Sequence, residues 1–217
     1  MLVELGGLDT SAVHHLMTLV VVPRPIAWVV SDNGEGHPSD TRWNLAPFSY
    51  FNAVASEPPM VMFSVGCSPC RADGGGSVKD TLTNVLARTH HTIALPHEGQ
   101  RDAVEETAAP VAPSHSEFGL AGLDAVAWDW SVPMPSGVRV ALGCTLDTVL
   151  PVGGGPQRLV LSRVERIWVD DAVLGTDAKG RTTVDARALD PLVRLGAGWY
   201  GSLGAPARPT RAVTVGR

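Results

Sequence analysis

The sequence predicts a mainly β protein of the α+β class, with a sheet that closes on itself and a few peripheral helices. Segments with strand character outnumber those with helix character. The 23 glycines and 17 prolines divide the chain into many short segments, as in a barrel or sandwich. Hydrophobic residues make up 44% and charged residues 18% of the chain, which is enough apolar material for a packed core. With 217 residues and no visible linker or internal repeat, we expect a single domain over residues 1–217.

Charge and hydropathy exclude several classes of function. The formal net charge is −5, and a general nucleic-acid binder would need a basic face, so we expect no nucleic-acid partner. No apolar run reaches the roughly 18 residues of a membrane span, and no signal peptide is visible at the N-terminus. Three cysteines are too few for a disulfide framework. We therefore expect a cytoplasmic protein without a membrane partner.

The first half of the chain alternates one helix with several strands. Asp9 is placed to cap a helix over Ser11–Met17. Residues 20–31 predict a strand that is kinked at Pro23–Pro25, which places it at an edge or rim because proline has no backbone donor. After a turn at residues 32–34, two further strands are expected over 44–52 and 60–65.

The strand over 60–65 is followed by a loop rich in glycine and serine, Cys67–Ser77. Asp80 or Thr81 is then placed to cap a helix that ends near Arg88. The remaining elements are predicted as a short strand over 92–95, a helix over 100–107, long strands over 138–150 and 158–169, and a loop-rich tail from residue 190.

Two stretches have the chemistry of a site for a phosphate-bearing planar ligand. A glycine- and serine-rich loop that leads into a helix presents free N–H groups at the positive end of the helix dipole. Lys79 adds a full charge there, and Thr81 adds a hydroxyl donor. Upstream, Asn44 and Ser49 are polar residues in an apolar strand, and the segment between them holds a small alanine and a rigid proline. Such a surface suits a flat ring with polar edge atoms.

These stretches resemble the flavin reductase-like family. The resemblance rests on Arg24-Pro25-Ile26-Ala27, on Asn44-Leu45-Ala46-Pro47-Phe48-Ser49, on Pro58-Pro59, and on Lys79-Asp80-Thr81 with Asn84, in that order. In the tail, Arg194-Leu195-Gly196 and Tyr200 are similar to a further family motif. The resemblance implies an FMN-binding split β-barrel, flavoredoxin-like, with Greek-key features. It also implies a homodimer with FMN at the interface.

The same resemblance assigns cofactor contacts residue by residue. The residues assigned to the isoalloxazine ring are Arg24, Pro25 and Ile26. The residues assigned to the ring and the ribityl chain together are Asn44, Leu45, Ala46, Pro47 and Ser49. Those assigned to the phosphate are Lys79, Asp80 and Thr81, with Arg71 as a further candidate. No residue is assigned as catalytic and none as a metal ligand, because the flavin itself carries the redox chemistry.

The implied activity is that of an FMN-dependent oxidoreductase driven by NADH or NADPH. The electrons would pass to free flavin for a partner monooxygenase, to oxygen, or to a small organic electrophile. One alternative is a non-enzymatic FMN electron carrier. Another is a split barrel that binds a different ligand, such as haem or a deazaflavin, or only a partner protein.

The chain departs from the family pattern in three places. The link over Glu35–Trp43 is longer, the strand at 91–95 lacks an asparagine, and Ala197 replaces a glycine. The first departure is expected to reshape the substrate side, and the second affects a polar contact near the cofactor.

Several other motifs have ordinary explanations. Cys67 and Cys70 have C-x-x-C spacing without a second ligand pair, and Cys144 is predicted as a buried apolar thiol. The G-x-G-x-x-G match at 196–201 is not followed by a helix, which argues against a dinucleotide fold. The side chains of the adjacent histidine pairs at 14–15 and 90–91 point in different directions, so these pairs are poor metal ligands. His37 and His115 are loop residues that either contact a substrate or have no functional role.

Overall fold

Alternation of side chains along the strands builds two hydrophobic layers. A computed structural model describes residues 2–66, 78–111 and 115–207. In β2 (Ala27–Asp32), Ala27 and Val29 point into one cluster, while Trp28 and Val30 point into a second. The first cluster fills the inside of the barrel. The second lies between the outer face of the sheet and the elements that cover it.

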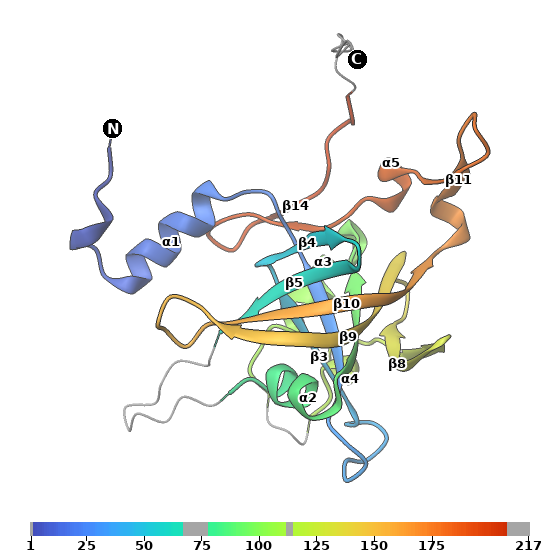
Figure 1. The fold of residues 1–217 in the computed structure, drawn as a ribbon, viewed down its shortest axis with the longest axis horizontal. Helices are drawn as coiled ribbons and strands as arrows, with labels where there is room; N and C mark the ends of the chain where they lie inside the picture. The colour runs from blue at the N-terminus through green and yellow to red at the C-terminus, as the bar shows by residue number, and fades with distance from the viewer. Residues whose placement is uncertain (1, 67–77, 112–114, 208–217) are drawn as a thin grey trace.

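A single seven-stranded antiparallel sheet forms the barrel, in the order β3-β2-β6-β9-β10-β5-β4. Its other strands are β3 (Trp43–Phe48), β4 (Phe51–Ser56), β5 (Pro59–Val65), β6 (His90–Leu95), β9 (Val140–Pro151) and β10 (Arg158–Val169). The β2–β6, β6–β9 and β10–β5 neighbours are crossovers, in keeping with the Greek-key features expected. Irregularities in β10 at Leu161/Ser162 and Val164/Arg166 bend the long β9–β10 hairpin around the core (Figure 1).

The barrel closes at a corner between two consecutive strands. β3 and β4 follow one another in the chain but occupy opposite ends of the sheet order. The prediction of one continuous strand over 44–52 is therefore wrong. The chain leaves one edge of the sheet at Phe48 and joins the opposite edge at Phe51. Only Ser49 and Tyr50 connect the two edges, and Ser64 N–H donates to the carbonyl of Tyr50 at 2.8 Å.

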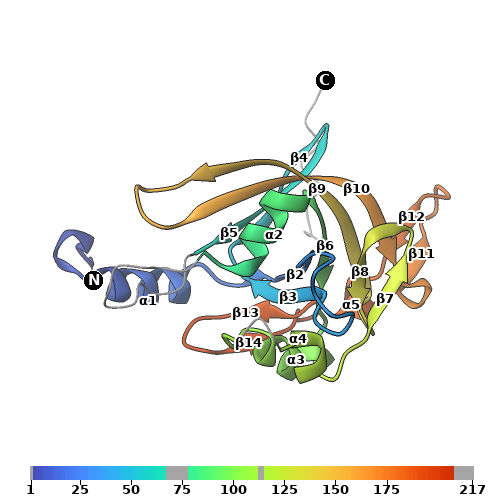
Figure 2. The same cartoon turned by 90° about the horizontal axis from the view of Figure 1, so that it is seen from below.

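Helices and short strands cover the outside of the barrel. They are α1 (Thr10–Val20), α2 (Asp80–Arg88), α3 (Arg101–Glu106), α4 (Glu117–Leu120) and α5 (Ala186–Leu189), with hairpins β7 (Ala125–Trp128)–β8 (Trp130–Pro135) and β11 (Leu174–Thr176)–β12 (Thr182–Val184). The 3-10 turns are η1 (Leu5–Gly7), η2 (Glu98–Gln100) and η3 (Asp171–Val173). Figure 2 shows α3 and α4 on the side of the barrel away from the β9–β10 hairpin. The Trp28 indole N–H donates to the Thr107 hydroxyl at 2.8 Å, which fixes the end of α3 to the outer core.

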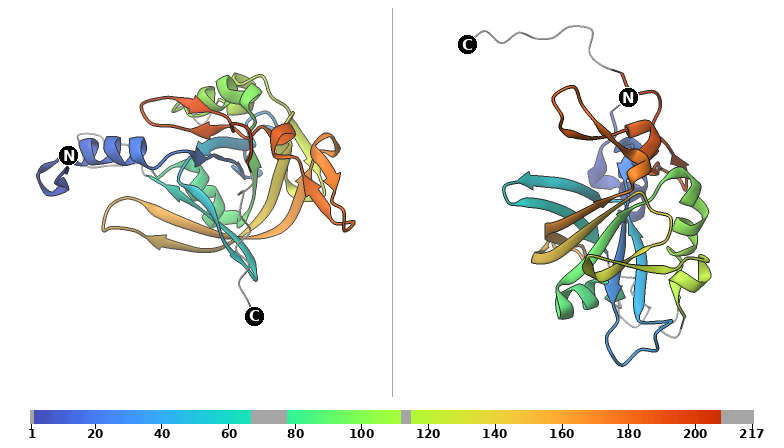
Figure 3. Two further views of the ribbon diagram at one scale, coloured as in Figure 1. Left: turned by 90° about the horizontal axis from the view of Figure 1, so that it is seen from above. Right: turned by 90° about the vertical axis from the view of Figure 1, so that its right-hand side faces the viewer.

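A third layer, which we call the C-terminal arm, is formed by residues 193–201. It contains β13 (Val193–Arg194) and β14 (Tyr200–Gly201), which join β1 (Arg24–Pro25) in a small sheet. The literal G-x-G-x-x-G match lies in this hairpin rather than before a helix, which agrees with the argument against a dinucleotide fold. In Figure 3 the arm runs beside the root of α1, which projects from the barrel.

Two helix boundaries differ from the sequence prediction. Asp9 caps α1 as predicted, through its carboxylate and the Ala12 N–H at 2.8 Å, but the helix continues to Val20. The strand expected over 20–31 is therefore two shorter strands, because the prolines near Arg24 interrupt the ladder. The N-cap of α2 is Lys79 rather than Asp80 or Thr81, and the Lys79 side chain makes no cap hydrogen bond. None of the described helices is long and apolar enough to span a membrane.

Candidate functional site

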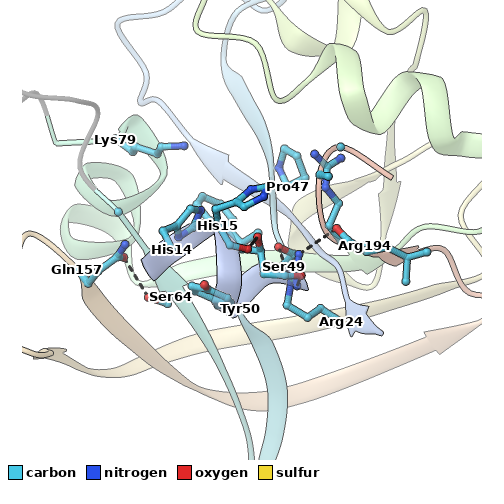
Figure 4. A pocket seen from close by; sticks show the side chains of 16 residues that line it. His14, His15, Arg24, Pro47, Ser49, Tyr50, Ser64, Lys79, Gln157 and Arg194 are labelled. Atoms are coloured by element: carbon cyan, nitrogen blue, oxygen red, sulfur yellow. Dashed lines mark hydrogen bonds between the residues drawn. The ribbon is translucent and has the colours of Figure 1, made fainter. Parts of the chain in front are cut away.

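A cavity opens at the corner where β3 passes into β4. We call it the corner cavity. Its volume is about 460 Å³, within the 300–1,000 Å³ range of small-molecule and cofactor sites. It is lined by His14, His15, Thr18, Arg24, Pro47, Phe48, Ser49, Tyr50, Ser64, Gly66, Lys79, Gln157, Arg194, Leu195, Ala197 and Gly198. These residues come from α1, the corner itself, the start of α2, the β9–β10 hairpin and the arm (Figure 4).

The corner cavity is electropositive, although the chain as a whole carries a net charge of −5. Arg24, Lys79 and Arg194 line it, and none of its described lining residues is an aspartate or glutamate. Figure 4 shows Lys79 toward one side of the cavity and the two arginines toward the other. Such a distribution favours an elongated ligand with negative charge at one end and an electron-rich group at the other.

Arg24 is a buried charge that ties three segments together. Its side chain is 5% exposed. The guanidinium donates to the carbonyls of Thr18 at 2.6 Å, Val21 at 2.8 Å and Leu195 at 3.2 Å, and its Nε lies 3.5 Å from the Ser49 hydroxyl. Arg24 therefore holds the end of α1 and the arm against the corner. Our prediction described this residue only as a ring contact and did not foresee this positioning role.

Arg24 and Arg194 are direct partners across β1 and β13. Burial lowers the pKa of the Arg24 guanidinium, and the charge of Arg194 lowers it further. Like charges directly opposite each other on a sheet are destabilising. The Glu105 carboxylate, 3.0 Å from Arg194 Nη1, offsets part of this repulsion, and an electron-rich ligand group between the two guanidiniums would reduce it further.

Lys79 supplies the positive charge at the other end of the cavity. Its Nζ lies 5.6 Å from the centre of the Phe48 ring. The Lys79 side chain makes no cap hydrogen bond, and the N-terminus of this nine-residue helix adds the positive end of its dipole beside Lys79. Ser64 lies nearby, and its hydroxyl donates to the Gln157 amide oxygen at 3.2 Å.

The structure separates the predicted cofactor contacts into groups. The corner cavity brings together Arg24, Pro47, Ser49 and Lys79. Ile26 lines a smaller cavity next to it, which also reaches Pro47 and Ser49. Pro25 is exposed, Leu45 is fully buried in the outer core, and Ala46 packs against the inner core. Arg71 lies outside the described residues, as do Cys67 and Cys70.

Asn44, Asp80 and Thr81 belong to a different environment beside α2. The Asn44 amide donates to the Thr81 hydroxyl at 3.0 Å, and both side chains are at least 95% buried. Asn84 extends this network to Ser31 and Asn33. Asn44 and Asp80 line a second cavity of about 340 Å³, which also contains His37, His115 and Glu117. The contacts predicted for Asn44 and Thr81 therefore compete with hydrogen bonds that the protein already makes.

Other lining residues had no individual sequence signal for this role. His14, His15 and Thr18 reach the cavity because α1 lies over the corner, and Gln157 reaches it from the β9–β10 hairpin. The histidine pair was noted only as a poor metal site, and the described residues contain no cluster suited to a metal ion. Cys144, predicted as a buried thiol, is fully buried, and burial raises its pKa.

Comparison with known proteins agrees with this architecture. A model of the flavin reductase like domain matches residues 19–189. An uncharacterised protein of Deinococcus radiodurans is 34% identical over 195 residues, covering 89% of this chain and 81% of that protein. Nitrilotriacetate monooxygenase component B from Bacillus cereus has a similar structure, with a TM-score of 0.82 and 28% identity over 96% of this chain and 98% of that one.

A second solved structure is that of the 2-nitrobenzoate 2-nitroreductase of Pseudomonas fluorescens. It gives a TM-score of 0.80 at 23% identity and covers 100% of this chain and 99% of that one, a likeness of fold alone. The predicted split β-barrel class is confirmed by the large antiparallel sheet and by these neighbours. The family match covers most of the chain, including the corner and α2, and the chain therefore belongs to the flavin reductase-like family.

Proposed function

We propose that the protein is an FMN-dependent oxidoreductase that takes electrons from NADH or NADPH. The observation that carries this proposal is the corner cavity, which combines three cationic side chains with the rings of Pro47 and Phe48 and lacks carboxylates among its described lining residues. FMN has a matching chemistry, with a phosphate at one end and a planar ring with polar edges at the other. The cofactor would supply the hydride chemistry.

The residues of the chain bind and orient the cofactor in this proposal. Lys79 and the positive N-terminal end of the α2 dipole hold the phosphate. Pro47 and Phe48 form a rigid wall for the ring. Arg24 fixes the walls in place, and the charge of Arg194 favours the anionic reduced form of the ring over the neutral oxidised form.

We further propose that the protein acts as a homodimer in the cytoplasm, with the flavin at the subunit interface. Helix α1 lines the corner cavity, yet none of its residues is buried. Met17, Leu19 and Val20 are 43%, 40% and 70% exposed. An eleven-residue helix is marginal without tertiary packing. A second copy packed on α1 would bury these side chains and enclose the cavity.

The electron acceptor belongs to the same proposal. Nitrilotriacetate monooxygenase component B is one part of a two-component enzyme by its name, which supports transfer to a partner monooxygenase. A small organic electrophile is the other acceptor that we propose.

Absorbance spectroscopy tests the proposal. The purified protein is mixed with FMN, freed of excess cofactor, and treated anaerobically with NADH and then NADPH. We expect a bound flavin spectrum that bleaches rapidly with one of the two donors. A bound flavin that neither donor bleaches would support an electron carrier instead, and failure to bind FMN would refute the cofactor assignment.

A further inference from the structure

A smaller cavity lies directly beside the corner cavity, under the C-terminal arm. We call it the arm cavity. Its volume is about 200 Å³, and it shares Pro47, Ser49 and Arg194 with the corner cavity. A molecule in the arm cavity would therefore touch the same side chains as a ligand in the corner cavity. The two occupants would be close neighbours.

One wall of the arm cavity is apolar and rigid. Ile26 and Val104 are 3% and 0% exposed and belong to the outer core, while Ala108 lies exposed at the edge. The adjacent Thr107 hydroxyl is held by the Trp28 indole and also donates to the Val104 carbonyl at 3.1 Å. This wall is therefore a preformed surface for a flat apolar group.

The opposite wall is a hydrogen-bonded group of three polar side chains. The Glu105 carboxylate accepts from the Tyr200 hydroxyl and from Arg194 Nη1, the latter at 3.0 Å. The centre of the Arg194 guanidinium lies 4.2 Å from the centre of the Tyr200 ring. The hydrogen bond from Tyr200 lowers the pKa of Glu105, with a further contribution from Arg194. Burial and the bond to Glu105 raise the pKa of Tyr200.

This wall is electrically balanced at neutral pH. It contains one guanidinium, one carboxylate and one neutral phenol, and their formal charges cancel. An anionic ligand would face the Glu105 carboxylate, and a cationic ligand would face Arg194. The Arg194 guanidinium has five N–H donors, and among the described residues one of them donates, to the Glu105 carboxylate. A neutral ligand with an acceptor oxygen can use the remaining donors without facing a like charge.

The size of the arm cavity sets a limit on the ligand. Sites for drug-sized molecules begin at about 300 Å³. A cavity of about 200 Å³ suits a compound with one ring and is too small for a nicotinamide dinucleotide. The arm cavity can therefore enclose a one-ring compound but not a whole dinucleotide.

We propose that the arm cavity is the binding site for the electron acceptor, an uncharged one-ring compound whose oxygen substituent accepts hydrogen bonds from Arg194. The ring lies against Ile26 and Val104, and its oxygen points to the arm. The description of this ligand as an electron acceptor rests on the proposed function, which places the flavin in the corner cavity. The binding site itself does not depend on the flavin.

Nuclear magnetic resonance titration of the ¹⁵N-labelled full chain, with and without FMN, tests the inference. Each of the three probes contains one benzene ring. Acetophenone is neutral and has an oxygen that accepts hydrogen bonds, benzoate is anionic, and ethylbenzene has no hydrogen-bond acceptor. We expect acetophenone to shift the amide signals of Val104 and Glu105 and to bind more tightly than either other probe. Ala108→Leu narrows the cavity, and overfilling of this kind is expected to weaken acetophenone binding by about tenfold. Ala109→Leu alters the neighbouring exposed alanine outside the cavity and is expected to leave binding unchanged.

The results separate this inference from the proposed function. Acetophenone binding that survives Ala108→Leu, or benzoate binding of equal strength, would overturn the assignment of the arm cavity. Arg194→Met keeps an apolar side chain of similar reach, and it should remove the preference for acetophenone over ethylbenzene. A preference that persists in this variant would also overturn the assignment. If acetophenone binds as expected but FMN does not bind, the binding site stands and only the proposed redox role fails.

Discussion

At the scale of single residues, Lys79 is the direct test of the phosphate end of the corner cavity. Hydrogen bonds to charged groups contribute about 1.5–3 kcal/mol. Lys79→Ala is therefore expected to weaken FMN binding by that amount. Lys179, an exposed lysine between β11 and β12, provides the control, because Lys179→Ala removes the same charge far from the cavity. Fluorescence titration of FMN measures both variants, and equal affinities would refute the phosphate assignment.

His91 gives the fold a defined sensitivity to acid. The side chain is fully buried beside Phe63, its Nδ1 lies 3.1 Å from the Thr89 carbonyl, and its Nε2 has no partner among the described residues. The carbonyl can only accept, so Nδ1 carries the proton and Nε2 remains a bare acceptor. Burial is the main cause of a pKa lowered from 6.5 to about 4.

The direction of the pH effect follows from this lowered pKa. Below pH 6.5 the unfolded chain binds a proton at His91 that the folded protein does not accept until about pH 4. The free energy of unfolding should therefore decrease as the pH falls through this window, by roughly 3 kcal/mol in total. Urea denaturation between pH 7.5 and pH 4 measures the effect. His91→Leu should show a shallower pH dependence, and an unchanged slope would exclude His91 as the cause.

At the scale of elements, the close packing of the arm against α1 depends on Gly196. A Cβ at this position would lie 2.8 Å from the Cα of Leu19, a contact with backbone that a side-chain rotation cannot relieve. Gly196→Ala is expected to push the arm away from α1, to disturb the Arg24 bond to Leu195, and to weaken FMN binding.

The control for this variant is Gly204→Ala, because a Cβ at Gly204 meets no atom within 4 Å. Hydrogen exchange measured by mass spectrometry should show faster exchange over residues 193–201 in Gly196→Ala alone. Exchange in the arm as slow as in the parent protein would show that the contact is not needed to hold the arm.

The elements also show how far sequence patterns reach. The helix cap at Asp9, the strand over 60–65 and the two long strands over 138–150 and 158–169 were predicted because apolar alternation and cap residues mark them locally. The continuous strand over 44–52 was wrong because strand-forming residues run through the corner without a break. The change of partner from β2 to β5 leaves no local mark in the sequence. The hairpins β7–β8 and β11–β12 were also not predicted.

At the scale of the whole molecule, the proposed homodimer predicts that flavin binding depends on protein concentration. Residues on the open face of α1 should be covered by the second copy, which also encloses the corner cavity. Dilution to the monomer should therefore release FMN. Analytical ultracentrifugation with detection at flavin and protein wavelengths follows both species. Flavin that sediments with a monomer would refute the interface assignment.

A variant of α1 separates dimer formation from local damage. Val20 is 70% exposed, so Val20→Asp should shift the equilibrium toward the monomer with little effect on the fold of the subunit. Val54, which is 47% exposed on β4, serves as a control in Val54→Asp. Dimer loss in both variants, or in neither, would contradict a specific role for the α1 surface.

The sequence alone determined the mainly β class and the family, because these depend on composition, periodicity and motifs that are local in the chain. It also placed Lys79 before a helix and Pro47 and Ser49 at the end of a strand. Only the tertiary structure decided which of these residues meet. The barrel closes between β3 and β4, and this closure brings Arg24, Lys79 and Arg194 to one cavity while it turns Asn44 and Thr81 toward each other. The physical reason is that pairing of strand edges and burial of polar groups are satisfied by partners distant in sequence, whose identity a local pattern does not contain.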